Sequence, residues 1–285
     1  MFRLALFRNR AFALGNLAGL LASMGRGGLQ FMLIIWLQGI WLPLHGYSYE
    51  STPLWAGIYL LPMTVGFVVA GPVSGYLSDK FGTRIFATTG LLVVAAAFVG
   101  MLLVPVDFDY RAFAVLTFIN GIGSGMFASP NTSQIMGAVG PTERGAAAGM
   151  RGTFFNAGSS LSIGVFFSLM VIGLAATLPQ TLTGGLVAHG VPHAVAAGVG
   201  ALPPVGSLFA AFLGYNPIAA LLGPTGVLAH LPAHQAATLT GTSFFPGLIS
   251  GPFHDGLVVV FTAAAVMMVI GAVASWLTGS DEADV

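Results

Sequence analysis

Six long apolar stretches limit what this chain can fold into more than any other feature of it. They cover roughly residues 12–38, 54–77, 85–106, 112–139, 146–178 and 256–278. A helix needs about 20 mostly apolar residues to cross the ~30 Å hydrocarbon core of a bilayer. Because lipid offers no hydrogen bonds to backbone groups, each stretch is expected to be helical. The sequence predicts an all-α membrane protein, a single six-transmembrane-helix bundle over residues 1–285.

The composition excludes a soluble domain. Only 6% of the residues are charged and 56% are hydrophobic, whereas a soluble domain carries about a quarter charged residues. The formal net charge is zero and no basic tract occurs, so no nucleic-acid partner is expected. Cysteine is absent, which excludes disulfides and thiolate metal sites. The expected surroundings are a lipid bilayer.

Basic residues predict how the helices are oriented. With six spans, almost all of them fall on one side of the membrane: Arg3, Arg8, Arg10, Lys80, Arg84, Arg144 and Arg151. Lys and Arg are enriched in cytoplasmic loops. We therefore expect an integral plasma (inner) membrane protein with both termini in the cytoplasm.

The stretch 179–255 is rich in glycine and proline and is expected to be a long extracytoplasmic loop. Its most apolar piece, residues 207–223, is too short for a span and is interrupted by Asn216-Pro217. That piece is interpreted as an external amphipathic helix or a shallow re-entrant element. A seventh span is the less favoured alternative.

A short polar loop, GYLSDKFGTR at residues 75–84, joins the second and third stretches. Its Asp79 can pair with a basic group such as Lys80 or Arg84, or lie at a helix N-terminus, and so hold neighbouring helices together. The alternative is a positively charged inner loop with an incidental acid.

The amino-acid sequence of this loop resembles the signature motif of the major facilitator superfamily. In that family the motif follows the second helix of each six-helix half. Gly75, Asp79, Lys80, Gly82 and Arg84 match the pattern, and Thr83 departs where a basic residue is usual. The segments FINGIGSGMFASPNTSQ and ERGAAAGMRGTFFNAGSSLSIG resemble the 14-helix drug:proton antiporter branch. The resemblance implies half of a major facilitator fold.

Two departures indicate which half the chain resembles. The first half of the family has an arginine in its fourth helix where this chain has Thr117, three residues before Asn120-Gly121. That half also has a Gly-Pro element in its fifth helix, and no proline lies between Gly145 and Leu178 here. The chain is therefore similar to a C-terminal half.

Arg26 is the most informative candidate for a functional residue. It lies near the middle of the first span, with Ser23 and Gln30 on the same helical face. A charged residue inside the membrane suggests a transport pathway or pairing with a partner half. A structural arginine bonded to a carbonyl is the alternative. No Asp or Glu lies inside a predicted span, so the carboxylate of any proton coupling would come from elsewhere, with Arg26 and Arg151 as its counter-charges.

Polar residues in the fourth and fifth spans are further candidates. Asn120 and Asn156 are the preferred cavity residues, although such groups more often hydrogen-bond between helices.

The pairs His189/His193 and His230/His234 have the i,i+4 spacing that can hold zinc on a helix. Each pair encloses a proline and lacks further ligands, so no metal site is expected. No HExxH or serine-nucleophile motif occurs, and an enzyme is not expected.

The resemblance implies the C-terminal half of a secondary active transporter that exports hydrophobic drug-like molecules by alternating access. Its energy source would be a proton gradient, with no cofactor. It would need a complementary six- to eight-helix half or a second copy. The alternative is a truncated, non-transporting membrane scaffold that pairs with other helices.

Overall fold

The regular elements of the computed structural model, which describes residues 3–213 and 216–279, are all helices. Six of them are long and apolar enough to cross a membrane, which confirms the predicted all-α membrane bundle. They are the broken helix Arg10–Leu44 (α1, Arg10–Trp36; the π-helical turn η2, Leu37–Trp41; α2, Leu42–Leu44), the broken helix Tyr49–Phe81 (η3, Tyr49–Ser51; α3, Thr52–Tyr59; α4, Leu61–Phe81), α5 (Thr83–Met101), α6 (Tyr110–Gly137), α7 (Arg144–Ala188) and α13 (Phe244–Trp276).

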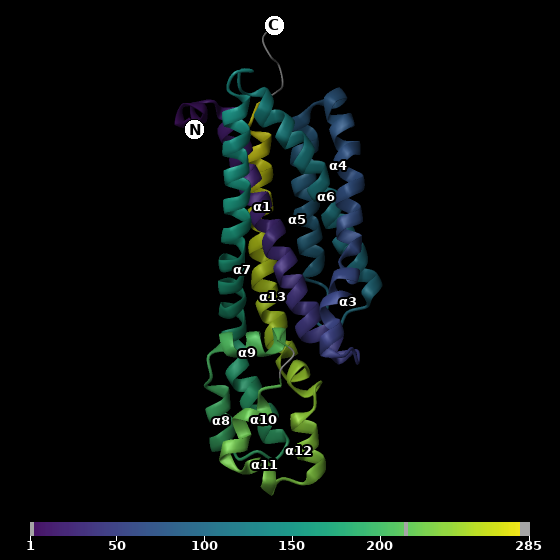
Figure 1. The fold of residues 1–285 in the computed structure, drawn as a ribbon, viewed down its shortest axis with the longest axis vertical. Coiled ribbons are helices and arrows are strands. Elements are labelled where there is room, and N and C mark those ends of the chain that lie inside the picture. Colours follow the sequence, from purple (N-terminus) through teal and green to yellow (C-terminus); the bar gives the residue numbers. More distant parts are fainter. Residues whose placement is uncertain (1–2, 214–215, 280–285) are drawn as a thin grey trace.

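The long helices form two groups of three. Helix α6 packs along both α4 and α5, while α1, α7 and α13 pack against one another, and the contact between α5 and α13 joins the groups. Figure 1 shows α4, α5 and α6 on one side of the bundle and α7 on the other, with α1 crossing obliquely between them. Helices α1 and α6 also contact each other between the two groups.

Glycines allow the backbones of neighbouring helices to approach closely where the helices cross. A Cβ atom on Gly123 of α6 would lie 2.7 Å from the carbonyl oxygen of Gly90 on α5, and one on Gly173 of α7 would lie 2.6 Å from the Cα of Gly256 on α13. Gly121 of α6 faces the backbone of Met63 on α4 even more closely. Such small residues let membrane helices approach and gain van der Waals contact without a hydrophobic driving force.

Both described ends of the chain lie at the same end of the bundle (Figure 1). Arg3 pairs with Glu143 at 3.0 Å, and the Asn9 side-chain amide donates to the carbonyl oxygen of Ala138 at 2.8 Å. Near the C-terminus, Gln134 donates to the Thr278 hydroxyl at 2.5 Å. The same end therefore carries the start of α1, the α6–α7 turn and the end of α13.

The stretch predicted as a Gly/Pro-rich loop is largely helical, which corrects that description. Helix α7 continues to Ala188 and α13 already begins at Phe244. Between them lie six short helices: α8 (His193–Gly200), α9 (Pro204–Phe212), α10 (Ile218–Leu222), η4 (Gly223–Thr225), α11 (Val227–His230) and α12 (Ala233–Thr240). Figure 1 shows them as a compact cap at the end of the bundle away from the termini.

Proline positions explain why the composition is misleading here. Pro192, Pro203, Pro217 and Pro232 each lie at the N-cap of a short helix rather than inside it. Proline is tolerated at the start of a helix because the first N–H groups have no intrahelical partner. The same residues that suggested a loop therefore begin helices.

The apolar piece 207–223 does not form a span of its own. Its described part divides between α9 and α10, and α8 and α9 are bent by 83° relative to each other. Leu208, Ile218 and Leu222 are fully or almost fully buried in the cap. Gly39 of η2 packs against the backbone of Ala211, so the cap rests on the end of the first span that lies away from the termini.

Two boundary differences bear on function. The third span ends at Met101 rather than near residue 106, and the loop after it accepts hydrogen bonds from the indoles of Trp36 and Trp41. The early start of α13 includes Asp255, whose carboxylate accepts a hydrogen bond from Thr177 at 2.8 Å. One acid thus lies within the N-terminal half of a long apolar helix, which the predicted boundaries had excluded.

Candidate functional site

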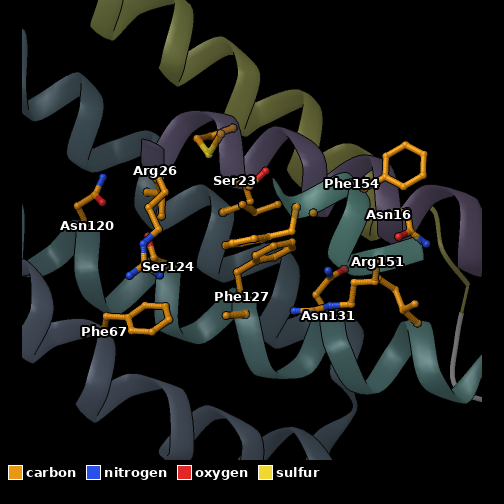
Figure 2. A pocket seen from close by; sticks show the side chains of 18 of the residues that line it. Asn16, Ser23, Arg26, Phe67, Asn120, Ser124, Phe127, Asn131, Arg151 and Phe154 are labelled. Carbon is orange, nitrogen blue, oxygen red and sulfur yellow. The ribbon is translucent and has the colours of Figure 1, made fainter. Parts of the chain in front are cut away.

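An internal cavity of about 50 Å³ lies where α1, α5, α6 and α7 converge, with one contribution each from α4 and α13. Figure 2 shows its polar residues facing a common space between the helices. The walls are mostly apolar and aromatic, with few polar groups among them. Those groups are Asn16, Ser23, Arg26, Asn120, Ser124, Asn131 and Arg151.

The first span supplies a polar stripe. Asn16, Ser23 and Arg26 all line the cavity, at spacings of seven and three residues that place them on one face of a helix. Gln30, predicted for the same stripe, does not line the cavity and is exposed. On α1, the polar residues that line the cavity therefore extend from Asn16 to Arg26 and no further.

Arg26 is held by an aromatic ring and not by an acid. Its guanidinium carbon lies 4.0 Å from the ring centroid of Phe67 on α4, a cation–π contact. Figure 2 shows its side chain directed toward Phe67 and Ser124. The ion pairs among the described residues are Arg3–Glu143 and His45–Asp107, so Arg26 has no carboxylate partner there. Its donors remain available for a ligand or a partner.

Helix α6 supplies the opposite wall through Asn120, Ser124, Phe127 and Asn131, which are separated by four, three and four residues. Asn120 and Asn131 are each 2% exposed. The Asn120 amide nitrogen and the Asn131 amide oxygen have no hydrogen-bond partner, and the same holds for the side-chain oxygen of Asn16. Buried polar groups are normally paired, so these three unpaired atoms mark a place for a bound group or water.

The predicted pathway residues are thus only partly brought together. Arg26, Asn120 and Arg151 line one cavity, whereas Gln30 and Asn156 lie outside it and are exposed. Asn16 was missed by the sequence reasoning, although its place seven residues before Ser23 on the same face was a usable signal. Nothing in the local sequence of Phe67 identifies it as the partner of Arg26, because the two residues lie on different helices.

The signature loop is short and built around a glycine. Gly82 has a φ of +95° and joins α4 to α5 directly, a conformation that other residues rarely adopt. Asp79 and Lys80 are exposed in the last turn of α4. No ion pair among the described residues involves Asp79. The predicted pairing is therefore not formed within the described chain.

Arg84 makes the defined contact in this region. Its guanidinium carbon lies 3.8 Å from the ring centroid of Trp276, near the end of α13. This contact links the loop to the last long helix, which is far away in the sequence. It ties the α4–α5 connection to the helix group that contains α1 and α7.

Replacing Arg84 by glutamine is expected to lower the free energy of unfolding by about 1 kcal/mol, since a partly buried cation–π contact contributes roughly 0.5–2 kcal/mol. The measurement is the unfolding midpoint of the purified chain in detergent. Lys80→Gln is the matched control, because Lys80 is exposed on the same loop and its own cation–π contact, with Phe81 at 5.5 Å, stays within α4. Equal effects of the two changes would show that the Trp276 contact carries no stability.

The cavity is small for a whole substrate. Sites for drug-sized ligands enclose about 300–1,000 Å³, and this one encloses about 50 Å³. It has room for a polar head group or a few waters. The cavity by itself is therefore too small to enclose a drug-sized molecule.

Comparison with known proteins agrees with this architecture. The family model described as Major Facilitator Superfamily matches residues 2–163, more than half of the chain. The chain is 24% identical over 286 residues to the tetracenomycin C resistance and export protein of Streptomyces glaucescens, covering 99% of this chain and 46% of that protein.

Two shorter matches have higher identity. The riboflavin transporter RibZ of Clostridioides difficile is 29% identical over 60% of this chain and 36% of its own length. The methylenomycin A resistance protein of Streptomyces coelicolor is 30% identical over 60% of this chain and 34% of its own length. The chain thus matches between about a third and a half of the length of these relatives. Its bundle of apolar helices and the match of the family model together make it an integral membrane protein of the Major Facilitator Superfamily.

Proposed function

We propose that this chain is the C-terminal half of a secondary active transporter that exports hydrophobic drug-like molecules in exchange for protons by alternating access. The observation that carries the proposal is the internal cavity, in which the unpaired cation Arg26 lies among apolar and aromatic walls. Ionisable residues inside membrane helices are costly and mark substrate or ion pathways. The names of two relatives, which include resistance or export, support outward transport of a small molecule.

The need for a complementary half is supported by the incomplete site. The cavity holds only part of a drug-sized ligand, and the polar residue Asn156 lies exposed on α7. The chain covers less than half of the length of the relatives it matches. A six- to eight-helix half, or a second copy, would supply the second wall and the titrating carboxylate, since no Asp or Glu lines the cavity in the described chain.

The proposed orientation places both termini in the cytoplasm. Lys80 and Arg84 flank the α4–α5 connection and Arg144 begins α7, at the end of the bundle where the described termini lie. Cytoplasmic loops carry an excess of such residues. The helical cap then lies on the outer face of the plasma membrane.

Transport is expected only when the chain is combined with a complementary half. The measurement is efflux of Nile red, an uncharged hydrophobic dye, from cells that express the chain alone, the half alone, or both. Efflux by the pair should stop when a protonophore collapses the proton gradient. If the pair assembles in the membrane but efflux stays at the background level, the chain acts as a non-transporting helix-pairing protein instead.

A further inference from the structure

The charged side chains that line the cavity are all positive among the described residues. Arg26 and Arg151 contribute two guanidinium groups, and the rest of the lining among the described residues is apolar, aromatic, hydroxyl or amide. The described ion pairs, Arg3–Glu143 and His45–Asp107, involve none of these residues. In a low-dielectric space, two unneutralised positive charges attract an anion and repel a cation.

The orientation of Arg26 suits anion binding. The guanidinium carbon lies 4.0 Å from the ring centroid of Phe67, and the five N–H donors of a guanidinium lie in its plane and point outward from that carbon. A carboxylate can therefore approach them edge-on and form two parallel hydrogen bonds. The cation–π contact holds the side chain in place while its donors stay free.

Unpaired amides provide a second, independent observation. The Asn120 amide nitrogen is a buried donor without a partner, and Figure 2 shows Asn120 at the same end of the cavity as Arg26. Asn131 lies beside Arg151 at the other end, and its side-chain oxygen is likewise unpaired. The Arg26–Asn120 end thus combines a cation with a neutral donor, which together match a carboxylate.

The walls around these groups are aromatic, with Phe67, Phe98 and Phe127 among them. We propose that the cavity binds the carboxylate of an aromatic, hydrophobic anion, with Arg26 and Asn120 holding the carboxylate and the phenylalanines contacting the ring. This rests on the proposed transport function and specifies its substrate class. The 50 Å³ space accepts the head group, and the remainder of the molecule would extend toward the complementary half.

Three probes that share one ring and differ in charge test the proposal: 1-naphthaleneacetate, 1-naphthylmethylammonium and neutral 1-naphthaleneethanol. Their binding is measured by equilibrium dialysis against the purified chain in detergent, with empty micelles as the blank, and again against the chain assembled with its complementary half. The acetate is expected to bind at least about tenfold more tightly than the ammonium, as a charge-assisted bidentate bond requires.

Substitutions test which residues cause the preference for the acetate. Arg26→Gln and Asn120→Leu should each weaken acetate binding, the former by about tenfold or more. Neither should weaken binding of the ammonium, because Arg26→Gln removes a charge that repels it. Arg26→Lys, which keeps the charge, should retain part of the preference and serves if the glutamine variant does not fold. Arg111→Gln is the matched control, because Arg111 is exposed at the start of α6 and outside the cavity.

Equal or tighter binding of the ammonium, or a preference that survives both Arg26→Gln and Asn120→Leu, would overturn the proposal. A preference present in the chain alone and lost in the assembled transporter would also overturn it, since a carboxylate of the complementary half would then occupy the site. Failure of Nile red efflux together with intact acetate selectivity would instead count against the transport function, so the two failures are distinguishable.

Discussion

Replacement of Gly121 by leucine is expected to leave no folded chain in detergent, the largest effect of any single change considered. Gly121 lies at the crossing of α6 and α4, where a Cβ atom would overlap the backbone of Met63. A backbone atom cannot move aside as a flexible side chain can, so the two helices must separate. The measurement is the yield of monodisperse protein by size-exclusion chromatography, with helix content measured by circular dichroism.

The milder variant Gly121→Ala adds the same first atom and is expected to cost about 1–3 kcal/mol, the usual range for overpacking. Gly164→Ala is the matched control, because Gly164 is helical and exposed on α7 and nothing lies within 4 Å of its added Cβ. In a helix this control should be neutral or slightly stabilising. If both variants unfolded at the same temperature, the close α4–α6 crossing would not be a source of stability.

Replacement of Arg26 by glutamine is expected to reduce efflux by the assembled transporter at least about tenfold, because a hydrogen bond to a charged group contributes roughly 1.5–3 kcal/mol and about 1.4 kcal/mol corresponds to a factor of ten. The guanidinium is the charged group of α1 in the cavity and has no carboxylate partner in the described chain. The measurement is the initial rate of naphthaleneacetate efflux at equal amounts of assembled protein.

Assembly of the variant with the complementary half, followed by co-purification, separates a transport defect from a folding defect. Arg111→Gln again serves as the control, since the Arg111 side chain lies outside the cavity. Unchanged efflux in a well-assembled Arg26→Gln protein would show that the arginine acts only in packing against Phe67.

The number and nature of the long helices could be predicted because they depend on local composition. A run of about 20 apolar residues has no stable alternative to a helix in lipid, and the six spans follow from this alone. The residues at which the helices begin and end were harder to predict from the sequence. Proline and glycine between residues 179 and 255 suggested a loop, and the structure shows prolines at the starts of short helices that bury Leu208, Ile218 and Leu222.

The candidate site was predicted in part, for a related reason. Helix periodicity places Ser23 and Arg26 on one face, but it does not say how that face is rotated relative to neighbouring helices. Gln30 and Asn156 therefore fell outside the cavity, while Asn16 and Asn131 lie in its wall. The signature loop was recognised from its residues, yet its contact with the last helix, from Arg84 to Trp276, joins residues that are far apart in the sequence.

The sequence by itself determined that this chain lies in a membrane, that its described part has six long apolar helices, and that a charged residue lies within the first of them. These properties follow from the cost of placing polar groups in lipid, which each segment meets separately. Only the tertiary structure decided that Arg26 rests on Phe67, that Asn120 and Arg151 share its cavity, and that no carboxylate joins them in the described chain. Those contacts depend on how closely the helices approach, which glycines on several different helices set together.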